Sequence, residues 1–151
     1  MMERHFCVSV YVYDPDDKKF LFIKHKKLKK WLMPGGHWEN NEFPDDTALR
    51  EVYEETGLTV RLIGERLPRD TDQIRPYGIQ RNIIKDGEHE HLDFIYFAVV
   101  GEEKQLIHNN EETDGINWFT INEINMETFD TFNECKEWCN YFSNRMGIME
   151  G

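Results

Sequence analysis

The sequence predicts an α/β protein: one domain, residues 1–151, in which a mixed β-sheet lies between helices as an α/β/α sandwich. Three observations favour this fold. Alternating apolar segments rich in β-forming residues occur along most of the chain. One short helix with clear start and stop signals interrupts them, and a second amphipathic helix lies near the C-terminus. The length is sufficient for one hydrophobic core.

The first part of the chain predicts a β-hairpin followed by a glycine turn. Residues 5–13 and 19–25 alternate as strands around a turn at 14–17. Five lysines lie between positions 24 and 30. This basic run is either a cationic rim that attracts polyphosphate or a solvated loop, and the solvated loop is the simpler interpretation. Residues 31–36 then predict a short strand that ends in two glycines.

A short helix is predicted from Pro44 to the residue before Gly57. Pro44 suits the first helical position, because its missing N–H would be unpaired there in any residue. Asp45 and Asp46 place negative charge at the positive end of the helix dipole. Gly57 can adopt the left-handed conformation that ends a helix. The apolar stripe of this helix is expected to comprise residues three or four apart: Ala48, Leu49, Val52 and Thr56.

Three strand-like segments follow this helix. Residues 59–67 alternate as a strand, and residues 77–84 can form another. An Asp-Gly turn at 85–88 then precedes residues 88–100, which have the strongest strand pattern in the chain. We expect that last strand to lie centrally in the sheet.

The final part of the chain predicts a loop, a strand and two helices. Residues 102–114 form an acidic loop and residues 115–119 a short strand, after which Thr120 can cap a brief helix that begins near Ile121. A longer helix is predicted over residues 130–146. Its sheet-facing side is expected to comprise Phe132, Cys135, Cys139, Phe142 and Met146.

Three glutamates lie on the polar face of the first helix. Glu51 and Glu55 are one turn apart, and Glu54 is beside them. Like charges at this spacing destabilise a helix by roughly 0.2–0.5 kcal/mol per pair. For the glutamates alone a solvated face is the simplest interpretation. A hard cation between the carboxylates would convert the repulsion into binding, because Mg²⁺ prefers oxygen ligands.

The stretch from Gly36 to Leu58 resembles the Nudix hydrolase signature, G-x5-E-x7-R-E-U-x-E-E-x-G-U, where U is a bulky aliphatic residue. Nine positions at fixed spacing are far more specific than a lone glycine motif. The order of predicted elements resembles the family over most of the chain. The fixed positions are all filled, by Gly36, Glu42, Arg50, Glu51, Val52, Glu54, Glu55, Gly57 and Leu58.

The resemblance implies a Nudix-type α/β/α sandwich with a mixed β-sheet between helices. It also implies a metal-dependent hydrolase that cleaves the diphosphate bond of a nucleoside diphosphate linked to another moiety. One to three Mg²⁺ or Mn²⁺ ions would be held by Glu51, Glu54 and Glu55. In the family a backbone carbonyl of the glycine turn, here that of Gly35 or Gly36, joins these ligands.

The family also suggests roles for individual residues. Arg50, Glu51 and Glu54 are the candidate catalytic residues. Arg50 is expected to form an ion pair with Glu42 that holds the loop against the helix. Glu51 is the first choice for the base that takes a proton from water. The reserve candidates for this base are Glu88, Glu90, Glu111 and Glu112.

A His-x-His-x-Asp pattern begins the central strand. His89, His91 and Asp93 share one face, whereas Glu90 lies on the other. All four are candidate substrate-binding residues, and related Nudix proteins often carry a similar strand near the active site. The pattern could instead bind a transition metal such as zinc or iron, hold the glutamate helix by hydrogen bonds, or form a polar sheet face.

The resemblance implies a small-molecule nucleotide substrate, but its identity stays open because specificity residues lie outside the signature. The candidates are a canonical or oxidised nucleoside triphosphate, ADP-ribose or a nucleotide sugar, a dinucleoside polyphosphate and capped RNA. The net charge of −11 argues against general nucleic-acid binding, apart from a capped RNA end. A catalytically silent nucleotide-binding or sensing protein is the alternative, and the complete set of glutamates argues against it. The oligomeric state is open, with a dimer possible.

The sequence predicts a cytoplasmic protein without a membrane partner. No apolar run is long enough to span a bilayer, and the N-terminal residues lead into a strand pattern and not into a signal peptide. Cys7, Cys135 and Cys139 are expected to be reduced residues in or near the core. A zinc site at these cysteines would need further ligands nearby.

Overall fold

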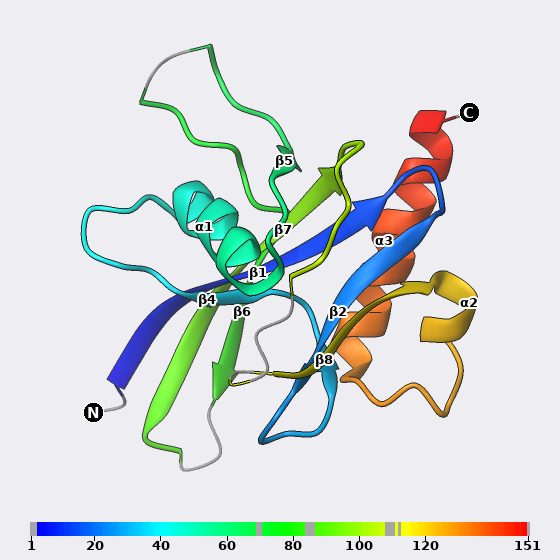
Figure 1. Cartoon of the computed structure of the whole chain (residues 1–151). Coiled ribbons are helices and arrows are strands. Elements are labelled where there is room, and N and C mark those ends of the chain that lie inside the picture. Colours follow the sequence, from blue (N-terminus) through cyan, green and yellow to red (C-terminus); the bar gives the residue numbers. More distant parts are fainter. Residues whose placement is uncertain (1–2, 69–70, 84–86, 108–110, 112, 151) are drawn as a thin grey trace.

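The computed structural model describes residues 3–68, 71–83, 87–107, 111 and 113–150 (Figure 1). Its strands are β1 (Glu3–Asp14), β2 (Lys19–His25), β3 (Trp31–Leu32), β4 (Gly35–His37), β5 (Val60–Ile63), β6 (Gly78–Ile83), β7 (His89–Val100) and β8 (Thr113–Thr120). Its helices are α1 (Pro44–Thr56), α2 (Ile121–Ile124) and α3 (Asn133–Glu150).

The described strands form one mixed sheet with the main order β3-β2-β1-β7-β5. In addition, β4 pairs with β1, β6 with β7, and β8 with β2. The β1–β7 pair is parallel, from Glu3 opposite His89 to Tyr13 opposite Val99, and the other pairs are antiparallel. The predicted hairpin is confirmed, because Tyr13 of β1 lies opposite Phe20 of β2. The strand predicted to be central, β7, has neighbours on both edges.

Helices cover both faces of this sheet. Figure 1 shows α1 in front of the sheet and α3 behind it. Val10 of β1 belongs to the core under α1, with Val52, whereas the adjacent Tyr11 belongs to the core under α3, with Phe142. Adjacent strand residues point to opposite faces, so β1 contributes to both cores. The predicted α/β/α arrangement is therefore confirmed.

Helix α1 has the predicted start and stop. Pro44 is its first residue, and Gly57 ends it with a φ of +78° and an N–H that donates to the Tyr53 carbonyl at 2.8 Å. The assignment of Leu49 to the buried stripe was wrong, since this side chain is 40% exposed. Thr47 is buried in its place. Successive residues point about 100° apart on a helix, so a face centred between Thr47 and Val52 leaves Leu49 outside.

Several observed strand boundaries differ from the predicted ones. The segment predicted as one strand over 31–36 is two strands, because β3 pairs with β2 whereas β4 pairs with β1. Strand β5 ends at Ile63, although alternation continues to residue 67. Strand β8 extends two residues further than predicted at its start and one residue further at its end. Residues 85 and 86 of the turn predicted at 85–88 lie outside the described residues, and Gly87 has a φ of +71°.

Helix α3 begins at Asn133, three residues later than predicted. Phe132 therefore precedes the helix, and its side chain is 37% exposed, so its assignment to the buried face was wrong. Cys7, Cys135 and Cys139 are buried free thiols, as expected. Within the described part of the chain, no helix combines the length and apolarity needed to cross a membrane.

Candidate active site

Two glycines bring β4 into direct contact with helix α1. A Cβ on Gly36 would lie 2.6 Å from the carboxylate carbon of Glu51, so a larger residue here would displace the Glu51 carboxylate from its present position. The N–H of Gly35 donates to Glu55 Oε1 at 3.2 Å. A Cβ on Gly35 would lie 2.1 Å from the carbonyl oxygen of Val8 on β1. The glycine turn thus holds Glu51 and Glu55 against the edge of the sheet.

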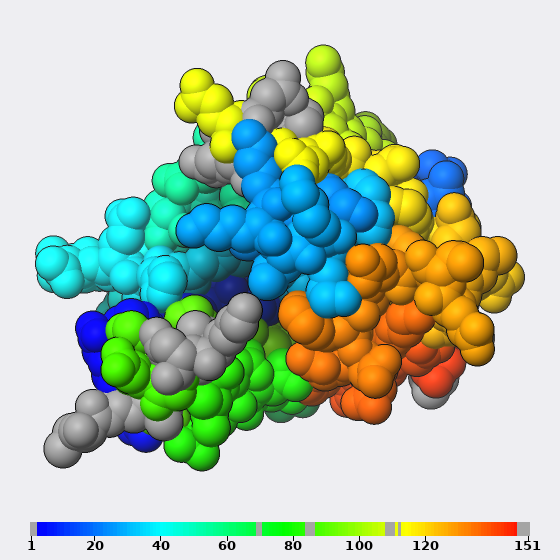
Figure 2. Space-filling view, turned by 90° about the horizontal axis from the view of Figure 1, so that it is seen from below, coloured from blue at the N-terminus to red at the C-terminus, as the bar shows by residue number. Residues whose placement is uncertain are grey.

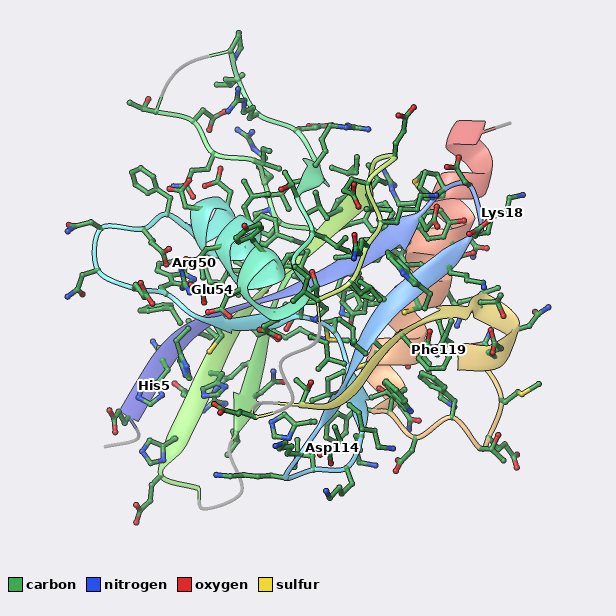
Figure 3. The ribbon with its side chains drawn as sticks, viewed as in Figure 1. His5, Lys18, Arg50, Glu54, Asp114 and Phe119 are labelled. Atoms are coloured by element: carbon green, nitrogen blue, oxygen red, sulfur yellow. The ribbon has the colours of Figure 1, made fainter. Side chains whose placement is uncertain are left out.

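Arg50 links the loop before α1 to the glutamates of the helix (Figure 3). Its guanidinium donates to both carboxylate oxygens of Glu42, at 2.6 and 3.0 Å, and to the carbonyl of His37 at 3.1 Å. The hydrogen bonds from Arg50 lower the pKa of Glu42 to about 2. Arg50 Nη1 also donates to Glu51 at 2.8 Å and to Glu54 at 3.1 Å. Arg50 therefore places positive charge beside Glu51 and Glu54, which offsets part of the repulsion expected from the spacing of the glutamates.

The donor atoms at this end of α1 suit Mg²⁺ or Mn²⁺. Glu51, Glu54 and Glu55 offer carboxylate oxygens, and the glycine turn offers backbone carbonyl oxygens. The three carboxylates do not place one oxygen each within 4.8 Å of the others. In this structure the guanidinium of Arg50 is the cation that contacts Glu51 and Glu54. A metal ion bound here would replace part of that contact.

A cavity of about 850 Å³ extends from the glutamate end of β4 across the face of the sheet that α3 partly covers. Gly36 and Glu55 line one end of it. Figure 2 shows a hollow between the green and orange surfaces, with the dark blue of β1 at its floor. The volume lies within the range of small-molecule sites. Side chains of β1 and β7 that line the cavity are Cys7, Ser9, Tyr11, His91, Asp93 and Ile95.

Asp93 is the cavity residue with an unsatisfied polar atom. Its Oδ2 accepts a hydrogen bond from Ser9 Oγ at 2.7 Å. Its Oδ1 is buried and has no hydrogen-bond partner among the described residues. Burial raises the pKa of the Asp93 carboxyl to about 6. A buried acceptor without a partner is uncommon. Because Asp93 lines the cavity, its carboxylate is suited to bind a donor group of a ligand.

A family model described as the NUDIX domain matches residues 3–136. The chain belongs to the Nudix family. It is 35% identical over 96 residues to a probable DHNTP pyrophosphohydrolase of Lactococcus lactis. The aligned residues make up 64% of this chain and 54% of that relative. It is 29% identical over 109 residues to an uncharacterized Nudix hydrolase of Bacillus subtilis. Here the aligned residues make up 72% of this chain and 62% of that relative. The chain thus spans between half and two thirds of the length of these curated relatives.

Solved structures share the fold of this Nudix protein. A NUDIX-family hydrolase from Clostridium perfringens is 26% identical, has a TM-score of 0.76, and matches over 98% of this chain and 99% of its own. An Ap4A hydrolase from C. elegans has a TM-score of 0.71 over 95% of this chain and 98% of its own. Its identity of 16% shows the fold alone. The fold predicted from the signature is therefore confirmed.

The Nudix fold separates the candidate substrate-binding residues onto two faces. His91 and Asp93 line the cavity, and His89 shares their side of β7. Glu90 points to the opposite face, where it is 3% exposed and forms ion pairs with Arg4 and Arg81. These two arginines lower the pKa of the Glu90 carboxyl, with Arg81 the larger contributor. The structure thus brings His91 and Asp93 together but places Glu90 elsewhere.

The reserve candidates for the base do not gather at the cavity. Glu88 and Glu111 are exposed and are not part of its lining. Glu112 lies outside the described residues. Glu134, in the first turn of α3, does line the cavity. No motif around Glu134 in the sequence predicts this position. The sequence cannot indicate which end of α3 faces the site.

Two lysines of the basic run are held in ion pairs. Lys29 Nζ lies 2.7 Å from Asp114 Oδ2, and Lys30 Nζ lies 2.7 Å from Asp130 Oδ1. These contacts join the loop between β2 and β3 to β8 and to the segment before α3. Their positive charge is therefore partly balanced within the protein, which favours a solvated loop over a rim that attracts polyphosphate.

Replacing Asp93 with asparagine is expected to stabilise the metal-free protein at pH 8. The raised pKa means that folding disfavours the ionised carboxylate, and this cost is present above about pH 6 and absent below about pH 4. The variant should gain about 1–3 kcal/mol in unfolding free energy at pH 8, and the gain should vanish near pH 4. Denaturant unfolding in chelator at both pH values measures this.

The matched control for this experiment is Asp17→Asn, because Asp17 is an exposed aspartate in the β1–β2 turn. It should change the unfolding free energy little at either pH. If the parent and Asp93→Asn have the same unfolding free energy at pH 8, the prediction is contradicted. Interactions in the folded state would then offset the cost of burying the ionised Asp93 carboxylate.

Proposed function

We propose that this Nudix protein is a metal-dependent hydrolase that cleaves the diphosphate bond of a nucleoside diphosphate linked to another moiety. The observation that carries the proposal is the continuity of the cavity. It runs from Gly36 and Glu55, beside the signature carboxylates, to the unsatisfied carboxylate of Asp93. One site can therefore hold the phosphates of a nucleotide at one end and its base at the other.

The signature residues supply the groups that this reaction needs. Glu51, Glu54 and Glu55, with the backbone carbonyl of Gly36, would hold Mg²⁺ or Mn²⁺. When bound, such an ion neutralises phosphate charge and lowers the pKa of a bound water. Glu51, fixed against the glycine turn, is our proposed base for the attacking water. Arg50 positions Glu51 and Glu54 through hydrogen bonds and anchors the preceding loop.

Asp93 is our proposed contact for the nucleotide base. The carboxylate of Asp93 belongs to the cavity lining and can accept a hydrogen bond from an N–H group, while Ser9 donates to its Oδ2. Heterocycles with exposed N–H donors fit this acceptor, and the name of the Lactococcus lactis relative, a probable DHNTP pyrophosphohydrolase, places that compound among those to be tested. Glu90 has no part in this pocket, because its side chain lies on the other face of the sheet and forms ion pairs with Arg4 and Arg81 there.

Turnover is expected to depend on a divalent metal and to disappear with excess chelator. The panel comprises canonical and oxidised nucleoside triphosphates, DHNTP, ADP-ribose, nucleotide sugars, dinucleoside polyphosphates and capped RNA, each with Mg²⁺ or Mn²⁺. Released phosphate, diphosphate or nucleoside monophosphate is measured. Turnover that persists in chelator contradicts the metal requirement. Tight nucleotide binding without turnover of any compound would instead identify a silent binding protein on this scaffold.

A further inference from the structure

Three histidines from three adjacent strands meet beside the cavity, and two of them line it. They are His5 of β1, His37 of β4 and His91 of β7. Each offers a ligand nitrogen that lies within 4.8 Å of the other two. In the part of the chain that the structure describes, this is the one group of three histidine, cysteine or acidic side chains with that property.

The sheet itself creates this arrangement. His5 lies directly opposite His91 in the parallel β1–β7 pair. His37 lies opposite Cys7 in the antiparallel β1–β4 pair, and Cys7 points to the same face as His5. The ring centroids of His37 are 5.3 Å from those of His5 and 5.1 Å from those of His91, both edge-on. The rings thus converge because of strand register and not through flexible loops.

The surroundings of the three rings favour metal ligation over anion binding. The ring centroid of His91 lies 5.1 Å from that of His37 and 5.8 Å from that of His5, so three imidazoles face one small volume. Neutral imidazole is the form that binds metals. Glu3 Oε1 lies 2.9 Å from His5 Nε2. A carboxylate on a ligand histidine is the usual second partner in zinc sites.

We propose that His5, His37 and His91 form a transition-metal site of the zinc class, separate from the signature carboxylates. Three nitrogen ligands suit zinc, which takes imidazole nitrogen in tetrahedral sites and leaves a fourth position for water or a ligand in open ones. Imidazole is a ligand for Zn²⁺, Cu²⁺ or Ni²⁺, whereas Mg²⁺ selects oxygen. Because His37 and His91 line the cavity, the open position would face the substrate pocket.

The test uses a protein whose carboxylate site is disabled. In the Glu51→Gln/Glu55→Gln double variant, Zn²⁺ is titrated by calorimetry and Co²⁺ by visible absorption. We expect one site per chain and the intense absorption of four-coordinate cobalt with nitrogen ligands. Adding His37→Ala to this background should weaken Zn²⁺ binding by roughly 10–100-fold or more, since His37 is exposed and its loss should spare the fold.

His25→Ala in the same background is the matched control, because His25 is a described histidine outside the cluster. It should bind Zn²⁺ like its parent, and far-ultraviolet circular dichroism should be the same for all variants. Unchanged Zn²⁺ affinity in folded His37→Ala overturns the proposal. So does loss of Zn²⁺ binding in the carboxylate double variant itself, since the ion would then belong to the glutamates. None of these outcomes depends on hydrolytic activity, so the proposed function is tested separately.

Discussion

Glu51→Gln is expected to lower kcat by about 10²–10⁴-fold, the loss typical of removing a positioned base. The substitution preserves the shape of a side chain that fits against Gly36, where a Cβ would lie 2.6 Å from its carboxylate carbon. It removes the negative charge needed to hold a metal ion or to accept a proton. Glutamine can still accept the hydrogen bond from Arg50, so the unfolding free energy should change by no more than about 1 kcal/mol.

Turnover at saturating Mg²⁺ and melting curves in chelator test this prediction together. Glu65→Gln is the control, because Glu65 is an exposed glutamate outside the signature. A Glu51→Gln protein that melts far below the parent would mark Glu51 as a structural residue. Full turnover with normal melting would show that Glu51 is not the base. Glu54, Glu55 and the cavity residue Glu134 would then be the next candidates.

Arg50→Ala is expected to lower both stability and activity. The arginine side chain is 20% exposed and binds Glu42, whose side chain is 16% exposed. Its loss leaves Glu42 with the hydrogen bonds from Thr47 and from the Glu39 N–H only. We expect a loss of about 1–3 kcal/mol in unfolding free energy, which is several degrees in Tm for a chain of this length. Activity should fall because Glu51 and Glu54 also lose a hydrogen-bond donor.

The pH dependence separates this ion pair from a general packing effect. The folded pKa of Glu42 is lowered from 4.5 to about 2, so the pair contributes stability above pH 4.5 that is lost as the pH falls towards 2. The stability gap between parent and Arg50→Ala should therefore narrow over that range. Arg61→Ala, on an exposed position of β5, is the control and should show no such gap. A gap of constant size down to pH 2 would contradict the electrostatic explanation.

The parts of this structure that depend on neighbouring residues could be predicted from the sequence. The ends of α1 follow from Pro44 and Gly57, and the alternation of β7 follows from its side-chain pattern. The Arg50–Glu42 ion pair followed from the resemblance to Nudix hydrolases. In each case the interacting residues are close in sequence or belong to a motif with fixed spacing.

Features set by the pairing of strands far apart in the sequence could not be predicted. The alternation of β1 places His5 on some face, but nothing local indicates that β1 runs parallel to β7 with His5 opposite His91. The same pairing brings Arg4 to Glu90, which changes an apparent site residue into a buried ion-pair partner. The register between distant strands depends on how all the strands compete for partners. A short window of sequence does not include those competing strands.

The parallel pairing of β1 with β7 also has a consequence for synthesis of the protein. Residues 3–14 leave the ribosome long before residues 89–100, and at roughly 5–20 residues per second the wait is on the order of several seconds. During that time β1 can pair with β2 at Tyr13 and Asp14 and with β4 at Cys7 to Ser9, but the edge that later pairs with β7 has no strand partner. Closing so long a loop carries a large entropic cost and slows folding. The cavity floor is therefore among the last parts to form, and chaperones that bind extended apolar segments should recognise the nascent β1 strand.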